Sequence, residues 1–341
     1  MNAPLPEWLQ LSWQRLVRSW QQERVPHAVL LTGPHGVGKH LLAQRLTALL
    51  LCEQPGEQGE PCGHCPSCGW LQAGSHPDLA EVVPEEAGKA IKIDQVRALA
   101  VELAMTSHGG RHKVAYIAPA EAMNVNAANS LLKTLEEPTE RTLLILSSAA
   151  PGRLPATVRS RCQQLRLQVP AEAQALDWLQ AQNLDAATAR RCLQIAGGAP
   201  LAAAELAASD LLAVRDQRLG ELVAVYGGKQ DPLRLAADWL GEHEARTLLW
   251  WQGWLQALVR WRQAGVPPVE APVAQTLQQI SESVDCQELY ALSDRIAGAL
   301  NSLGSGLNRQ LLLEDLLIDW ARLAGRPDAT ATATGSNKKP L

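Results

Sequence analysis

The sequence predicts an α/β phosphate-loop domain followed by purely helical domains, and three observations support this fold class. Residues 33–40 read GPHGVGKH, which satisfies the spacing GxxxxGK of a phosphate-binding loop. The apolar run Ala28–Thr32 precedes this loop and apolar residues at helical spacing follow Lys39, so strand, loop and helix occur in the required order. After Pro170 the strand signals disappear, while helical periodicity continues.

The phosphate loop keeps the residues that would hold a nucleotide but has lost the usual metal ligand. Gly33, Gly36, Gly38 and Lys39 remain, and in such loops the backbone N–H groups and the lysine bind the phosphates. His40 stands where the motif requires Ser or Thr, whose hydroxyl coordinates Mg²⁺. An imidazole is bulkier and prefers softer metals. We therefore expect a nucleotide-binding fold in which this chain does not hydrolyse ATP with Mg²⁺.

The strand predicted at residues 114–117 indicates the same loss. An ATPase places acidic residues at the end of such a strand, where they hold the metal and orient the attacking water. Here the strand runs into Ala118 and Pro119. Glu121 is the nearest carboxylate, but it stands about one helical turn too late, and we interpret it as a solvated residue or a helix-start acid.

Four cysteines form the other strong pattern, with the spacing C-x9-C-x2-C-x2-C: Cys52, Cys62, Cys65 and Cys68. Gaps of two residues let a tight turn direct successive thiolates at one tetrahedral ion, which favours structural Zn²⁺ in a module at residues 52–69. The alternatives are two disulfides, which a reducing cytosol would disfavour, or an iron–sulfur cluster, whose usual spacing differs. We expect His64, between the ligands, to be a bystander.

The most recognisable stretch of the chain follows the phosphate loop. Residues 126–138 read NAANSLLKTLEEP, a helix with one apolar face that a proline ends. A predicted strand at residues 142–146 comes next, and then Ser160-Arg161-Cys162. This order closely resembles bacterial clamp-loader subunits of the AAA+ class, and the resemblance covers residues 26–162 strongly and the later helices loosely.

The departures from the motif narrow the resemblance to one kind of subunit. The gamma/tau subunits of the DNA polymerase III clamp loader carry GK[ST] and an acidic strand end, and this chain has neither. It is more similar to the subunit type with a degenerate loop and a zinc module. The resemblance implies a structural subunit whose partners are the gamma/tau ATPase subunits, the delta subunit and the sliding clamp. Primed DNA would be reached through the whole complex.

The resemblance also implies a role for Arg161. An arginine presented across a subunit interface can reach the γ-phosphate held by its neighbour, so Arg161 would be an arginine finger that acts in trans. The alternative is a surface arginine with a carboxylate partner. Arg159 competes for the role, because alternation along an extended segment would place both side chains on one side.

Together these patterns predict an AAA+ P-loop domain with an inserted zinc module, a small helical lid domain and an all-α collar domain. The boundaries are 1–168 for the P-loop domain, 169–208 for the lid, 209–325 for the collar and 326–341 for a disordered tail. Within the lid, Pro200 occupies the place where ATP-binding relatives carry a second sensing arginine. In the collar, one apolar helix face is expected to contain Trp250, Trp254, Leu258 and Trp261. Periodicity does not tell a private core from a face shared between subunits.

Composition limits the remaining function classes. The chain has 46% hydrophobic residues, yet no apolar run reaches the roughly 18 residues of a membrane helix, so we expect a cytoplasmic protein. Its net charge of −4 offers no general attraction to nucleic acid, which disfavours an autonomous zinc-ribbon nucleic-acid binder. An active P-loop ATPase is the other alternative, but His40, Ala118 and Pro119 are obstacles to it. No intrinsic catalysis is expected from this chain.

Overall fold

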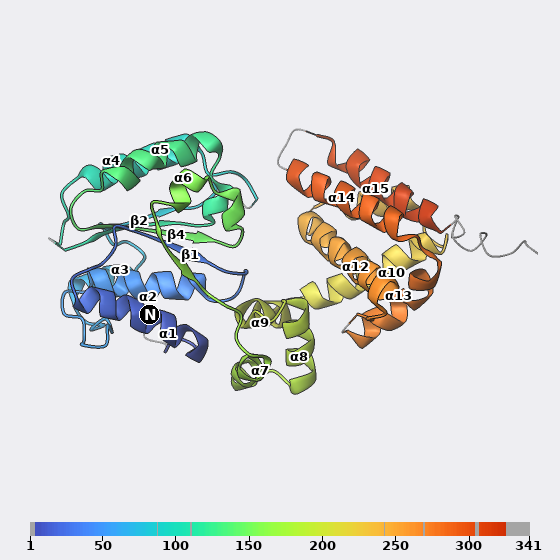
Figure 1. The fold of residues 1–341 in the computed structure, drawn as a ribbon, viewed down its shortest axis with the longest axis horizontal. Coiled ribbons are helices and arrows are strands. Elements are labelled where there is room, and N and C mark those ends of the chain that lie inside the picture. Colours follow the sequence, from blue (N-terminus) through green and yellow to red (C-terminus); the bar gives the residue numbers. More distant parts are fainter. Residues whose placement is uncertain are drawn as a thin grey trace, which may run out of the picture. The chain divides into compact units, whose positions relative to one another are not determined.

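The computed structural model describes residues 4–86, 88–109, 111–241, 243–268, 270–303 and 307–324 (Figure 1). The chain forms two compact units, Met1–Glu205 and Leu206–Leu341. The tail predicted at residues 326–341 lies outside the described residues.

A five-stranded parallel sheet is the centre of the first unit. Its strands lie in the order β2-β3-β4-β1-β5. The bounds are β1 Ala28–Thr32, β2 Leu79–Val82, β3 Lys113–Ile117, β4 Thr142–Ser148 and β5 Gln163–Arg166. Every residue of β1, β3 and β4 is buried, as expected for strands that helices cover on both faces. The predicted strand at Ala28–Thr32 has the predicted bounds, and the other two predicted strands each prove slightly longer.

Two layers of helices cover the sheet (Figure 1). One layer contains α1 (Glu7–Gln21), α2 (Lys39–Leu51) and α3 (Pro66–Gln72), and residues of α1 and α2 form an apolar core with β1, β3 and β4. The other layer contains α4 (Ile93–Ala104), α5 (Val125–Glu136) and the short α6 (Ala156–Arg159). Two 3₁₀ turns, η1 (Ala120–Ala122) and η2 (Pro151–Arg153), follow β3 and β4. Both therefore lie at the carboxyl edge of the sheet, where ligands of parallel sheets bind.

Three helices follow β5. They are α7 (Glu172–Ala181), α8 (Ala186–Ile195) and α9 (Pro200–Ala208). Asp185 caps α8, because its carboxylate accepts hydrogen bonds from the N–H groups of Ala187 and Thr188. Gly197 and Gly198 both have positive φ and reverse the chain into α9, which places the first turn of that helix beside the phosphate loop.

The second unit is helical throughout its described residues. It contains α10 (Leu211–Tyr226), α11 (Pro232–Asp238), α12 (Glu244–Ala264), α13 (Ala271–Ser283), α14 (Cys286–Ser302) and α15 (Arg309–Leu323). They share one core in which Trp251 lies between Trp239 and Trp320, at ring-centroid distances of 5.8 and 6.1 Å and edge to face. Trp254 and Leu258 are buried as predicted, while Trp250 and Trp261 are only partly buried.

None of the helices in the described part of the chain combines the length and the apolar character needed to cross a membrane.

Candidate nucleotide loop, cysteine cluster and arginine motif

The phosphate loop connects β1 to α2 and depends on its glycines. Gly33, Gly36 and Gly38 have φ values of 149°, 75° and 105°, which L-residues with a Cβ rarely adopt. The N–H of Gly33 donates to the Ser148 carbonyl at 3.3 Å, which fixes the loop to the end of β4.

Lys39 begins α2 and turns back onto its own loop. Its Nζ donates to the carbonyl oxygens of Gly33 at 2.7 Å and Pro34 at 2.6 Å. Burial lowers the pKa of Lys39, and the negative charge of Glu121 acts in the opposite direction. Two of the three donors of the ammonium group that would hold phosphate therefore already have partners within the chain.

Two other helices of the unit contact the loop directly. The N–H of Leu201, in the first turn of α9, donates to the Gly36 carbonyl at 3.0 Å. A Cβ at Gly36 would lie only 2.3 Å from the Cβ of Ala202. From α1, the Trp8 Nε1–H donates to the Val37 carbonyl at 3.0 Å. These contacts fix the loop in one conformation by backbone and indole hydrogen bonds that need no ligand.

The two departures from the ATPase pattern have clear structural positions. His40 is exposed, and its ring lies 5.7 Å from that of Tyr116 on β3. At the end of β3, Ala118 and Pro119 lead into η1. Neither position provides an oxygen side chain for Mg²⁺.

The interpretation of Glu121 as a solvated or helix-start acid is incomplete. It is in the first turn of η1, but its carboxylate is half-buried, and Oε1 accepts from the N–H groups of Ala149 at 2.9 Å and Ala150 at 3.2 Å. These two residues follow β4, which pairs with β3 in the sheet. Sequence spacing could not reveal this contact, because it joins the ends of two neighbouring strands.

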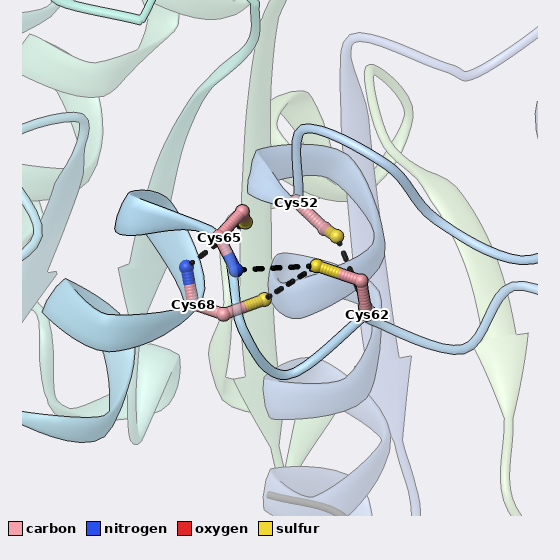
Figure 2. Close-up of side chains that lie close together, drawn as sticks. All are labelled: Cys52, Cys62, Cys65 and Cys68. Atoms are coloured by element: carbon pink, nitrogen blue, oxygen red, sulfur yellow. Dashed lines mark hydrogen bonds between the residues drawn. The ribbon is translucent and has the colours of Figure 1, made fainter.

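The four cysteines converge beyond the other end of α2. Cys52 follows the last residue of that helix, Cys62 and Cys65 precede α3, and Cys68 lies within α3 (Figure 2). All four Sγ atoms lie within 4.8 Å of one another, and none forms a disulfide. Backbone N–H groups donate to three of these sulfurs: Cys62 to Cys52 at 3.2 Å, Cys65 to Cys62 at 3.4 Å and Cys68 to Cys65 at 3.4 Å. The cluster can therefore hold a metal ion.

The local environment shifts the pKa values of the cluster's thiols in different directions. A hydrogen bond from the backbone N–H of His64 lowers the pKa of Cys62 to about 6, whereas burial raises the pKa of Cys68 to about 12 and also raises that of Cys52. A cation between the sulfurs would offset the cost of ionising the buried thiols. The His64 ring contacts the Cys62 carbonyl, at 2.9 Å from Nδ1, and is not part of the sulfur cluster.

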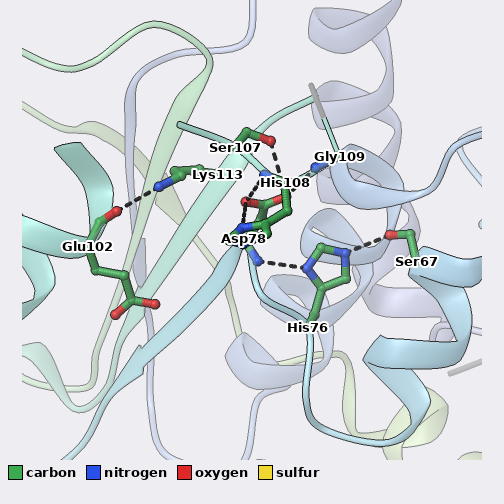
Figure 3. Close-up of polar contacts among 8 residues, drawn as sticks. All are labelled: Ser67, His76, Asp78, Glu102, Ser107, His108, Gly109 and Lys113. Carbon is green, nitrogen blue, oxygen red and sulfur yellow. Dashed lines mark hydrogen bonds and ion pairs between the residues drawn. The ribbon is translucent and has the colours of Figure 1, made fainter. Parts of the chain in front are cut away.

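A polar network that the sequence did not suggest joins the cysteine module to the sheet (Figure 3). The Ser67 hydroxyl donates to the Leu51 carbonyl at 2.6 Å, and its oxygen lies 2.7 Å from His76 Nε2. His76 Nδ1 accepts from the Asp78 N–H at 3.0 Å, so the proton of the neutral ring is on Nε2. The Asp78 carboxylate in turn accepts from Ser107, His108 and Gly109. Burial lowers the pKa of His76, which keeps the ring neutral.

Arg161 lies just after the carboxyl end of α6. It forms an ion pair with Glu136 at the end of α5, and its Nη1 donates to the Thr157 carbonyl at 2.9 Å. Its side chain is 35% exposed, so it is accessible. The extended conformation expected around Arg159 is wrong: residues Ala156–Arg159 are helical, because Pro155 begins a short turn of helix there. Strand-like alternation therefore does not relate Arg159 to Arg161.

Comparison with known proteins identifies the family. A DNA polymerase III subunit delta′ from Pseudomonas aeruginosa is 36% identical over 334 residues, which cover 95% of this chain and 99% of that protein. The chain belongs to the DNA polymerase III delta-prime subunit family. The delta-prime subunit of Escherichia coli is 35% identical over 332 residues, covering 91% of this chain and 93% of that protein.

Two protein-family descriptions and a solved structure also match this chain. The family described as DNA polymerase III, delta subunit, matches residues 9–171, and its C-terminal counterpart matches residues 209–322. A solved DNA polymerase III gamma subunit-related protein from Thermotoga maritima is 17% identical, with a TM-score of 0.41 and coverage of 91% of this chain and 99% of that chain. The two delta-prime relatives confirm the resemblance to clamp-loader subunits at the level of this family.

Proposed function

We propose that this chain is a structural, non-hydrolysing subunit of the DNA polymerase III clamp loader. In this role it helps the complex to load the sliding clamp on primed DNA, with gamma/tau ATPase subunits and a delta subunit as partners. The family supports membership of the complex. The observation that carries the non-hydrolysing role is the phosphate loop, whose lysine and carbonyls are bound by the chain itself.

The chemistry of hydrolysis supports this role. Phosphoryl transfer to water requires a metal that bridges the phosphates and a group that orients the water. His40 supplies no hydroxyl, and the end of β3 supplies Ala118 and Pro119. Glu121, the nearest acid, is bound to two backbone N–H groups. Gly33, Gly36, Gly38 and Lys39 would then maintain the shape of the loop rather than hold a reacting nucleotide.

Arg161 is the residue through which the chain contributes to hydrolysis by a neighbour. The guanidinium is partly exposed and carries its full charge at neutral pH. In the chain alone Glu136 is its partner, so the finger must exchange that carboxylate for a γ-phosphate when a neighbouring subunit is present. A triphosphate offers more negative charge than one carboxylate, and bidentate contacts to phosphate suit the planar guanidinium.

The cysteine cluster is assigned to a structural zinc ion. Thiolates at about 2.3 Å from a tetrahedral Zn²⁺ lie about 3.8 Å apart. The Sγ atoms of Cys62 and Cys68 are 4.0 Å apart, and all four lie within 4.8 Å, so small side-chain adjustments complete the site. Cys52, Cys62, Cys65 and Cys68 leave no open coordination position, which makes the zinc structural rather than catalytic.

We assign the two helical regions to a lid and a collar. Residues 169–208 would be the lid, whose first turn of α9 contacts the phosphate loop. Residues 209–325 would be the collar, and the single core formed by α10 to α15 provides a stable body on which a shared face can be built.

The deciding experiment compares ATP turnover by the isolated chain with turnover by a reconstituted complex. We expect negligible turnover from the isolated chain and clamp-stimulated turnover after gamma/tau and delta subunits are added. Turnover by the isolated chain near about 1 s⁻¹ that Lys39→Ala abolishes would support the alternative, an active ATPase subunit.

A further inference from the structure

We propose that Glu121 is the internal counter-anion of Lys39 and the residue that excludes polyphosphate from the phosphate loop. This inference rests on the proposed non-hydrolysing role and gives it a specific cause. Loss of metal ligands explains why hydrolysis would fail, but it leaves open why the loop should not simply bind nucleotide.

The phosphate loop and Glu121 are both hydrogen-bonded to the backbone at the end of β4. The Ser148 carbonyl accepts the N–H of Gly33, the first residue of the phosphate loop. The next two residues, Ala149 and Ala150, donate their N–H groups to Glu121 Oε1. One short stretch of backbone therefore binds the loop on one side and the carboxylate on the other, which places the carboxylate beside the loop.

The two oxygens of the Glu121 carboxylate have different surroundings. Oε1 is anchored by two N–H groups, whereas Oε2 is buried and accepts no hydrogen bond from any residue that the structure describes. A buried carboxylate oxygen requires a compensating positive group. Lys39 is the cation on which the charge of Glu121 acts through space: burial lowers the pKa of the ammonium group, and the carboxylate raises it in part.

The negative charge of Glu121 should weaken the binding of phosphate groups to the loop. In a functional phosphate loop, the lysine and the backbone N–H groups attract the phosphates. Here a carboxylate lies at the same strand edge and acts on Lys39 through space, so a polyphosphate would have to approach a fixed negative charge. Two like charges a few ångströms apart in a partly buried site repel strongly enough to weaken binding by about tenfold or more.

The test measures binding without hydrolysis. The full chain and its Glu121→Gln variant are titrated with inorganic tripolyphosphate and with ATP by calorimetry, in buffer without magnesium and without chelator. Glutamine keeps an oxygen that accepts the N–H groups of Ala149 and Ala150, and Glu121→Ala is the second variant if glutamine disturbs folding. Glu140→Gln, which removes an exposed carboxylate from the loop before β4, is the matched control.

We expect Glu121→Gln to bind tripolyphosphate and ATP at least about tenfold more tightly than the unmodified chain and Glu140→Gln. Adding Lys39→Met to Glu121→Gln should abolish the gain. Equal affinities for the unmodified chain and both Glu121 variants, or a gain that survives Lys39→Met, would overturn the role of Glu121. Undetectable binding to all variants would overturn it as well, while leaving the proposed structural role intact, since that role depends on turnover and assembly.

Discussion

Helix α2 has a different kind of cluster at each end, and the contrast shows that one is satisfied by hydrogen bonds within the chain whereas the other could hold a metal ion. At its start, Lys39 and the loop carbonyls are hydrogen-bonded to groups of the same chain. Beyond its end, four thiols face one another, and the hydrogen bonds they receive come from neutral N–H groups. The first site is complete without a ligand. At the cysteine cluster, ionised thiols would repel one another without a cation between them. Of the two sites, only the cysteine cluster therefore requires a bound cation.

The largest effect is expected from the cysteine cluster. Cys65→Ser should reduce the zinc content from one ion per chain to nearly none and should lower the free energy of unfolding by about 4 kcal/mol or more, because the tetrahedral site is broken. Metal analysis and thermal unfolding measure both effects. Cys286→Ser is the control, since this half-buried thiol begins α14 and is not part of the cluster. A stable, metal-free protein purified without chelator would contradict the zinc assignment.

A single methyl group at Gly36 should disturb the contact between the phosphate loop and the start of α9. Gly36→Ala introduces a Cβ at 2.3 Å from that of Ala202 and at a φ of 75°, so we expect it to destabilise the first unit by about 1–3 kcal/mol. Chemical denaturation measures this. Gly152→Ala, in the same unit and with nothing within 4 Å of the added Cβ, should change stability by less than about 0.5 kcal/mol. Equal effects of the two changes would show that the start of α9 does not cover the loop.

Arg161, which we propose acts on a neighbouring subunit, extends the contrast to a third site. In a reconstituted clamp loader, Arg161→Ala should reduce DNA- and clamp-stimulated ATP hydrolysis, although ATP sites served by other arginines should continue to turn over. Assembly should be nearly unchanged, because a partly exposed arginine contributes modestly to affinity. Arg161→Lys should restore little of the stimulated ATP hydrolysis, because lysine lacks the planar set of donors of a guanidinium group.

Arg159→Ala is the matched control for this measurement. Unchanged turnover with Arg161→Ala would remove the finger assignment, and a defect confined to Arg159→Ala would transfer it to that residue.

The smallest predicted effect is a pH dependence of the network that joins the cysteine module to the sheet. Because burial lowers the folded-state pKa of His76, the unfolded chain binds the proton more readily. The stability due to the neutral ring is present above the unfolded pKa of about 6.5 and is lost as the pH falls through the lower folded pKa. Unfolding measured between neutral and mildly acidic pH should therefore show a shallower decline for His76→Gln than for the unmodified chain. The exposed His35→Gln should retain the full decline.

The sequence predicted local features well and missed contacts between distant segments. The apolar run at Ala28–Thr32 became a strand with those bounds, and close spacing brought the four cysteines together. The hydrogen bonds of Trp8 and Leu201 to the loop, and of Ala149 to Glu121, link residues far apart in sequence. Periodicity describes one face of one element, so it cannot identify the partner of that face.

Helix α12 shows the same limit within a single element. The predicted face included Trp250, whereas the fully buried residue is Trp251. Each residue advances about 100° around a helix, so two adjacent tryptophans compete for one face, and the neighbouring helices decide which of them is buried.

The cluster of Trp239, Trp251 and Trp320 has an optical consequence. The chain contains 11 tryptophans, three tyrosines and no phenylalanine, so indole rings dominate its near-ultraviolet absorption and its fluorescence. Three rigid indoles packed edge to face in one core should emit at short wavelength and give strong near-ultraviolet circular dichroism. Trp70, on α3 directly after the cysteine module, is 43% exposed and should emit at longer wavelength. The first unit contains an edge-to-face pair of its own, Trp8 and Trp178, so near-ultraviolet circular dichroism should report on the packing of both units without any added dye.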